Sequence, residues 1–226
     1  MTMKILLKSA NTNDILNCFN SGLVDGVDVD LPIYTDKGIG PLSQFYDNLT
    51  SLVVRELHVP LRGDYETMAA NADTLIKRYG DSITLKIPVT FDGLRLCKEL
   101  TAFGHRVNMV MVYNPSQAVM AAKAGATNIT VQVGEIDDLG YAGLEVLRSV
   151  ASMNRSLGVA TEVVGNDLRT THRVVRALYN GASTVVLEPK VFRDMTKHVL
   201  TEAQLDASKG MIDLNEFLAD DNLVGG

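Results

Sequence analysis

Short runs of apolar, mostly β-branched residues alternate along the chain with amphipathic stretches. Runs of this length and composition, set between turn residues, are typical of buried strands. The predicted strands are residues 4–9, 27–30, 52–59, 83–88, 107–113, 127–133, 159–164 and 183–188.

Helices are predicted between these runs, where apolar side chains recur at helical spacing. One apolar stripe consists of Tyr65, Met68, Ala72, Leu75, Ile76 and Tyr79, and another of Leu139, Gly143, Val146, Val150 and Met153. Residues 114–117 predict a helix start, because Asn114 can cap it, Pro115 suits its first position, and Gln117 suits a capping box.

Eight strands alternating with about eight helices predict a (β/α)8 barrel in the α/β class. An open, doubly wound sheet is the alternative, but no glycine-rich dinucleotide turn follows the first strand. The 226 residues fit one domain. We therefore expect residues 1–226 to form a single barrel domain, with a tail of about residues 201–226 that forms an extra helix.

Composition narrows the functional classes. Apolar residues make up 46% of the chain and charged residues 21%, with a net charge of -6. This balance argues against a nucleic-acid or anionic-membrane partner, since either would need a basic surface. We find no apolar run of membrane-spanning length and no signal-peptide pattern, so we expect a cytoplasmic protein. Cys18 and Cys97 are expected to be reduced core residues, and the four histidines lack metal-ligand spacing.

Lys86 is the candidate for chemistry. It lies in the predicted strand 83–88, near the end that turns into the next helix, which is where β/α barrels place their active sites. Burial disfavours an ammonium ion, and a neutral amine is a nucleophile toward carbonyls. The alternative is a structural lysine that is paired or reaches the strand end.

The residues around Lys86 carry a resemblance to a known family. Residues 85–94 resemble the Schiff-base segment of small transaldolases and fructose-6-phosphate aldolases. Further similar segments are residues 22–27, 104–126, 133–138 and 197–201, so the resemblance covers almost the whole chain.

The resemblance implies a class I aldolase mechanism without a cofactor. Lys86 would form an imine with a ketose, and cleavage of a carbon–carbon bond would leave a dihydroxyacetone enamine. Asn108 matches an asparagine that hydrogen-bonds substrate hydroxyls. Glu56 matches the residue that organises the catalytic water, although the neighbouring Arg55 leaves this register uncertain by one.

Several positions depart from the family pattern. Lys8 replaces an aspartate on strand one, and residues 28–31, with Asp28 and Asp30, replace the Thr-Thr-Asn-Pro motif. Gln132 replaces an aromatic residue, and Glu135 replaces the arginine that grips the substrate phosphate. On strand seven, a serine and a basic residue are replaced by Val163 and Gly165, or by Glu162 if the register slips by one.

The departures suggest a changed substrate. A charged hydrogen bond to phosphate contributes roughly 1.5–3 kcal/mol, and a glutamate would repel phosphate instead. We therefore expect Glu135, Asp28 and Asp30 to disfavour sugar phosphates. Lys8 is either a solvated strand end paired with Asp28 or Asp30, or a cation close enough to Lys86 to favour its neutral amine.

Two functions remain open on the sequence. The first is an aldolase or transaldolase that acts on a small carbonyl or sugar substrate; the alternative is a silent barrel of this family that serves binding or assembly. Apolar residues of the tail favour an oligomer over a monomer whose tail folds back, and the family resemblance implies that this oligomer is cyclic, a pentamer or decamer. The apolar tail residues are Leu205, Met211, Leu214, Phe217 and Leu218.

Overall fold

The fold is a closed barrel of eight parallel strands, in sequence order around the barrel. A computed structural model describes residues 3–29, 42–51 and 56–209. The strands are β1 (Lys4–Leu7), β2 (Gly26–Asp28), β3 (Glu56–Pro60), β4 (Ile83–Pro88), β5 (Val107–Val112), β6 (Asn128–Gln132), β7 (Glu162–Asn166) and β8 (Thr184–Leu187). β8 pairs with β1 and closes the barrel, so the predicted (β/α)8 fold is confirmed.

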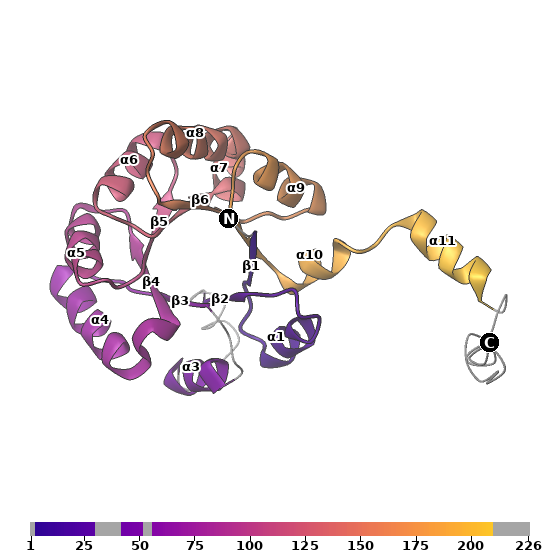
Figure 1. The fold of residues 1–226 in the computed structure, drawn as a ribbon, viewed down its shortest axis with the longest axis horizontal. Coiled ribbons are helices and arrows are strands. Elements are labelled where there is room, and N and C mark those ends of the chain that lie inside the picture. The colour runs from indigo at the N-terminus through magenta and orange to yellow at the C-terminus, as the bar shows by residue number, and fades with distance from the viewer. Residues whose placement is uncertain (1–2, 30–41, 52–55, 210–226) are drawn as a thin grey trace, which may run out of the picture.

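Helices surround this barrel (Figure 1). They are α1 (Thr12–Phe19), α3 (Leu42–Ser51), α4 (Tyr65–Tyr79), α5 (Phe91–Ala102), α6 (Pro115–Lys123), α7 (Val133–Asp138), α8 (Gly143–Ser156), α9 (Thr171–Tyr179) and α10 (Pro189–Asp194), with a 3-10 turn, η1 (Gly80–Ser82). A last helix, α11 (Val199–Ser208), follows outside this ring. The predicted stripe of α4 matches its full length. The second stripe began too early, since Leu139 follows α7 and is 71% exposed.

Most predicted strands overlap the observed ones closely, and β4 matches at both ends. Residue 30 of the second predicted strand and residues 52–55 of the third lie outside the described residues. The seventh strand is the exception, because β7 begins at Glu162 and extends to Asn166, beyond the predicted end at residue 164. Gly165 and Asn166 look like turn residues in sequence, but they pair with Val131 and Gln132 of β6. The ladder to β6 therefore extends the strand past its β-branched run.

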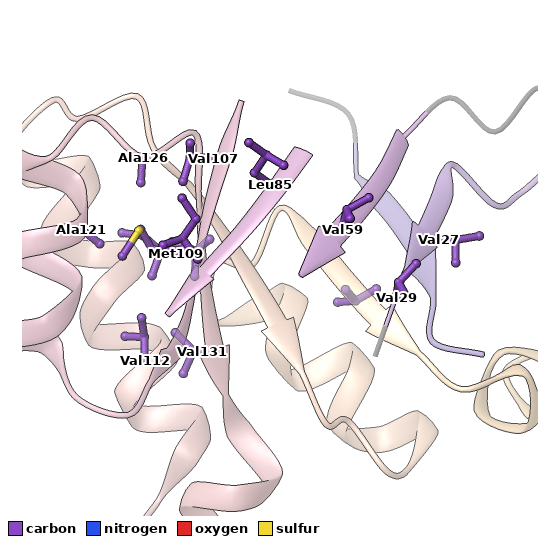
Figure 2. Packing of buried hydrophobic residues seen from close by; sticks show 14 of the residues in the cluster. Val27, Val29, Val59, Leu85, Val107, Met109, Val112, Ala121, Ala126 and Val131 are labelled. Atoms are coloured by element: carbon purple, nitrogen blue, oxygen red, sulfur yellow. The ribbon is translucent and has the colours of Figure 1, made fainter. Parts of the chain in front are cut away.

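The main hydrophobic core lies between the strands and the helices. Figure 2 shows part of it, with Met109 of β5 and Val131 of β6 near Ala121 of α6. Leu85 and Ile87 of β4 belong to this core, and the alternation of side chains along a strand therefore turns Lys86 into the barrel.

The interior of the barrel is unusually polar. In most barrels of this type branched apolar residues fill the interior. Here a small apolar cluster of Leu6, Val164 and Val186 shares the interior with buried polar side chains. These polar side chains include Asp28, Glu56, His58, Thr84, Lys86, Asn108, Asn128, Thr130 and Thr184. A buried polar group lowers the stability of the fold unless it is hydrogen-bonded, so the stability of this interior depends on the partners of these side chains.

A β-bulge interrupts β5. The register to β6 shifts between Met109 and Val112, and Met111 adopts a left-handed backbone with φ 62°. A non-glycine residue in this region is strained, and such strain gathers near functional sites. After the bulge, Val112 packs in the outer core and Tyr113 packs partly against it.

α11 lies apart from the ring of helices in Figure 1. It has no buried residue, and Val199, Leu200 and Leu205 are 73%, 65% and 60% exposed. The other apolar tail residues that were considered, from Met211 to Leu218, lie outside the described residues. Within the described ranges, no helix has the length and apolar character needed to cross a membrane.

Candidate active site

Lys86 is held near the carboxyl end of β4 by a tight strand-to-helix connection. Thr90 caps α5, with its hydroxyl oxygen 3.0 Å from the backbone nitrogen of Gly93. A Cβ at Gly93 would lie 2.0 Å from the carbonyl oxygen of Pro88, so only glycine permits this close approach. α5 therefore starts directly against the end of the strand that carries Lys86.

The Lys86 ammonium is paired with Asp28 of β2. Its Nζ donates a short hydrogen bond to Asp28 Oδ1 and a second one, of 2.9 Å, to the carbonyl oxygen of Val29. Lys86 is 6% exposed and Asp28 2% exposed. Lys86 is therefore buried, as predicted, and it is paired. Its partner, Asp28, is one of the residues that replace the Thr-Thr-Asn-Pro motif of the family on the second strand.

His58 of β3 lies behind this pair and is fully buried. Its Nδ1 is 3.8 Å from Asp28 Oδ2 and 3.0 Å from Asn108 Nδ2, and its Nε2 is 3.2 Å from Glu56 Oε1. Asn108 is opposite Lys86 in the β4–β5 ladder and accepts a 2.8 Å hydrogen bond from the Thr130 hydroxyl. The Asn108 amide, expected to bind substrate hydroxyls, therefore bonds to His58 and Thr130.

Glu56 lies at the other end of the barrel interior from the mouth. It is the first residue of β3, whereas Pro60, four residues later, is opposite Lys86. Four residues of strand span about 13 Å. The Glu56 carboxylate is 3.2 Å from Lys4 Nζ, and Lys4 is 3.5 Å from Glu162. The structure therefore does not bring Glu56 to Lys86, contrary to the role that was expected for it.

Burial alone would raise the pKa of the Glu56 carboxyl. The hydrogen bond to His58 and the nearby ammonium of Lys4 outweigh burial and lower this pKa from 4.5 to about 2. Glu56 is therefore a carboxylate throughout the neutral range, and it contacts His58 on the side away from the mouth of the barrel.

A cavity of about 260 Å³ opens at the mouth, at the carboxyl ends of β1, β7 and β8. Its lining includes Lys8, Asn166, Val186, Glu188 and Arg169. Lys8 follows the last residue of β1, so it belongs to the mouth, while the hydrogen bonds of Lys86 go to Asp28 and Val29.

The remaining predicted mouth residues also lie at the carboxyl ends of strands. Gln132 ends β6 and accepts a 2.6 Å hydrogen bond from Asn166. Glu135 is in the first turn of α7 and accepts a 2.5 Å hydrogen bond from the Tyr113 hydroxyl. Burial and this bond raise the pKa of Tyr113 to about 12. Asp30 lies outside the described residues.

The strand-seven residues at the mouth differ from those expected. Val163 packs in the outer core, and a Cβ on Gly165 would meet side chains of α8 and α9, so both face the helices. Glu162 lies at the amino end, near Lys4. The residues that reach the cavity are Asn166, Asp167 and Arg169, because β7 extends farther than its apolar run.

Sequence reasoning missed three residues of the site, His58, Asp167 and Arg169. His58 was passed over because it shows no ligand spacing, although it lies two residues after Glu56 in a run that reads as a strand, and alternation places both side chains on one face. Arg169 was missed with the end of β7. It pairs with Asp138 at 2.6 Å and Asp167 at 2.7 Å, so its charge is balanced by carboxylates.

The cysteines take no part in this site. Both Cys18 and Cys97 are free and buried, and burial raises the pKa of the Cys97 thiol to about 12. Such a thiol is a poor nucleophile.

Comparisons with known proteins agree with this geometry. Residues 42–223 match the family model described as transaldolase/fructose-6-phosphate aldolase. A probable transaldolase of Ruegeria sp. (strain TM1040) is 32% identical over 226 residues, covering 99% of this chain and 98% of that protein. One of Bartonella bacilliformis is 34% identical over 204 residues, covering 90% and 93%.

Among solved structures, a mutant mandelate oxidase with a monooxide FMN adduct superposes with a TM-score of 0.59 at 14% identity, covering 89% of this chain and 69% of that one. At this identity the likeness shows the barrel fold alone. The family match and the relatives do not favour the silent barrel. The chain belongs to the transaldolase/fructose-6-phosphate aldolase family and is an enzyme of the transaldolase or aldolase type.

Proposed function

We propose that Lys86 is the Schiff-base lysine of a class I aldolase or transaldolase that acts on a dihydroxyacetone-type ketone donor. The observation that carries this proposal is the buried Lys86 amine, which points into the barrel from β4 within the segment shared with the family. The reaction would cleave or transfer a carbon–carbon bond of a small sugar, and we propose a cytoplasmic location for it.

The chemistry follows from an amine at this position. The amine adds to the ketone carbonyl, and loss of water gives an iminium ion. The positive nitrogen then draws electrons from the neighbouring carbon–carbon bond, which breaks to leave an enamine and release an aldehyde. Protonation and hydrolysis release dihydroxyacetone, or a second aldehyde accepts the three-carbon unit.

An aldol-addition assay tests this activity. The purified protein, incubated with dihydroxyacetone and glyceraldehyde, should form a six-carbon ketose that chromatography detects. The same assay with the Lys86→Met variant is the control for background reaction. A wild-type rate no faster than this control, across a panel of small aldehydes, would contradict the proposal.

We propose that unphosphorylated ketones are better substrates than fructose 6-phosphate. Glu135 places a carboxylate at the start of α7, beside the mouth. The nearby cations of Arg169 and Lys190 already pair with carboxylates, Arg169 with Asp138 of α7 and Lys190 with Asp194, each at 2.6 Å. A phosphate would have to displace these partners to gain a charged contact.

Glu135→Arg is therefore expected to lower the KM for fructose 6-phosphate by about tenfold or more, since a charged hydrogen bond contributes about 1.5–3 kcal/mol. The KM for dihydroxyacetone should be unchanged. Glu135→Gln is the matched control, because it removes the charge but keeps an oxygen that can accept from Tyr113. Efficient wild-type turnover of fructose 6-phosphate would contradict this account of the mouth.

We further propose that the protein forms a cyclic homo-oligomer, a pentamer or a decamer. The described part of α11 has no buried residue and lies apart from its own barrel (Figure 1). Its exposed Val199, Leu200 and Leu205 supply apolar surface of the kind that interfaces cover.

Truncation before Thr201 should therefore reduce the mass of the assembly in light scattering while the barrel keeps its circular dichroism spectrum. The full-length protein at the same concentration is the control. A full-length chain that is monomeric would contradict the assembly, as would a truncated chain of unchanged assembly mass.

A further inference from the structure

The pairing of Lys86 with Asp28 bears on how the lysine amine loses the proton that it carries as an ammonium ion. An ammonium ion has no lone pair, so Lys86 must lose a proton before it can attack a carbonyl. Its Nζ donates to Asp28 Oδ1 and to the Val29 carbonyl oxygen. A backbone carbonyl cannot accept a proton under these conditions, whereas a carboxylate can. Asp28 is therefore the proton acceptor in contact with the reacting nitrogen.

The second oxygen of Asp28 faces an imidazole nitrogen whose state the hydrogen bonds define. The Thr130 hydroxyl donates to Asn108 Oδ1, so Asn108 Nδ2 is the atom that faces His58 Nδ1 and donates to it. His58 Nδ1 thus carries a lone pair, and Nε2 carries the hydrogen donated to Glu56. Asp28 Oδ2 lies 3.8 Å from the same nitrogen, Nδ1.

We propose that Asp28 is a catalytic residue that carries protons between Lys86 and the substrate oxygen, and that His58 is a positioning residue that holds the Asp28 carboxyl group in place. This inference rests on the proposed Schiff-base function and names the acid and base for it. His58 Nδ1 lies 3.8 Å from Oδ2, the oxygen of Asp28 that does not contact Lys86, and the imidazole therefore holds the carboxyl group with Oδ1 toward Nζ.

The protons balance over the whole step. Asp28 takes one proton from the Lys86 ammonium, the free amine forms the bond to the carbonyl carbon, and Asp28 gives that proton to the resulting alkoxide. It then takes a second proton from the carbinolamine nitrogen and gives it to the hydroxyl group, which leaves as water. The nitrogen lone pair forms the carbon–nitrogen double bond. The step begins with an ammonium–carboxylate pair and ends with an iminium–carboxylate pair, so no net charge crosses the barrel interior.

A purely electrostatic role for Asp28 makes the opposite prediction. A carboxylate that only holds Lys86 as an ammonium would slow imine formation, because it favours the unreactive form. Removing its charge with Asp28→Asn would then leave the rate unchanged or raise it. If Asp28 carries protons, the same variant should lower the rate by about 10²–10⁴-fold, the usual contribution of general acid–base catalysis.

The experiment measures the rate at which dihydroxyacetone and cyanoborohydride form a reduced adduct on Lys86, followed by mass spectrometry. We expect at least a hundredfold lower rate for Asp28→Asn, and a wild-type rate for Thr184→Val, a matched interior control. The Thr184 hydroxyl has no hydrogen-bond partner among the described residues. A wild-type or faster rate in Asp28→Asn would overturn the inference and leave the proposed function intact. Absence of an adduct in the wild-type protein would overturn both.

A second pair of variants guards against misfolding of Asp28→Asn. In Asp28→Gly the lost carboxylate leaves room beside Lys86, and added formate should restore part of the trapping rate, whereas added chloride should not. His58→Gln should lower the maximum trapping rate without changing the dihydroxyacetone concentration that gives half of it. No rescue by formate in folded Asp28→Gly, or a changed half-saturating concentration with an unchanged maximum in His58→Gln, would contradict the assigned roles.

Discussion

Lys86→Met is expected to lower kcat/KM for aldol addition by roughly 10³-fold or more, because it removes the only group that can form the covalent intermediate in the proposed mechanism. Methionine matches the length and apolar volume of the lysine stem. The amine points into the barrel and bonds to Asp28 and Val29, so no contact of the outer core is lost. The coupled formation of a six-carbon ketose measures the loss.

The same variant should also destabilise the fold. Without the ammonium, Asp28 is a buried carboxylate whose remaining contact with a basic side chain, among the residues that the structure describes, is the 3.8 Å approach to His58. Breaking a buried pair by removing one partner costs about 3–5 kcal/mol. The double variant Lys86→Met with Asp28→Asn removes both charges, and it should recover most of this stability in urea unfolding but none of the activity. Recovery of activity, or a single variant as stable as the wild type, would contradict the assigned pair.

Glu56→Gln is expected to lower the free energy of unfolding at neutral pH by at most about 3 kcal/mol, the energy to which a shift from 4.5 to about 2 corresponds. The carboxyl pKa is lower in the folded protein than in the unfolded chain, so the unfolded chain binds the proton more readily in acid. The stabilisation is therefore complete above pH 4.5 and is lost as the pH falls toward 2. Urea unfolding between pH 7 and pH 2.5 measures it.

A surface carboxylate provides the matched control for this experiment. Glu145 pairs with Arg148 on the exposed side of α8, and both side chains are more than half exposed. Glu145→Gln should change the free energy of unfolding by less than about 1 kcal/mol at any pH, because solvent screens such pairs. Glu56→Gln could instead behave like Glu145→Gln and leave the loss of stability in acid unchanged. That result would contradict the conclusion that His58 and Lys4 lower the pKa of Glu56.

The sequence predicted the barrel because the strand and helix periods alternate clearly along it. Lys86 could be placed inside the barrel for the same reason, since Leu85 and Ile87 on either side are apolar and alternation along a strand has period two. The boundaries of β4 were predicted fully because a Gly-Asp-Ser turn precedes it and Thr90 caps the following helix.

The ends of β5 and β7 could not be predicted in the same way. The bulge at Met111 depends on a register shift between two strands, and the sequence of one strand carries no record of it. Gly165 and Asn166 extend β7 because β6 offers them ladder partners, against their own turn propensity. The two missing residues at the end of the strand hid Asp167 and Arg169. Val163 and Gly165 face the helices for a separate reason, since they alternate with Val164, which faces the interior.

The polar side chains inside the barrel are brought together by contacts between strands. Asp28, His58 and Lys86 come from three different strands, and their meeting depends on the registers in which Asp28 is opposite His58 and His58 is opposite Thr84. Sequence reasoning placed Asp28 at the mouth as a charge that repels phosphate. The structure shows a second consequence of the same residue, because it is the partner of the candidate nucleophile.

Reductive trapping of the wild-type protein tests the central claim most directly. Full-length protein is incubated with dihydroxyacetone and borohydride, digested, and examined by mass spectrometry for the reduced three-carbon adduct. The proposed function predicts one dominant adduct on Lys86, and its disappearance in Lys86→Met. An intact protein without an adduct, or one labelled on Lys4 or Lys8 while Lys86 stays unmodified, would contradict the assignment of Lys86 as the Schiff-base lysine.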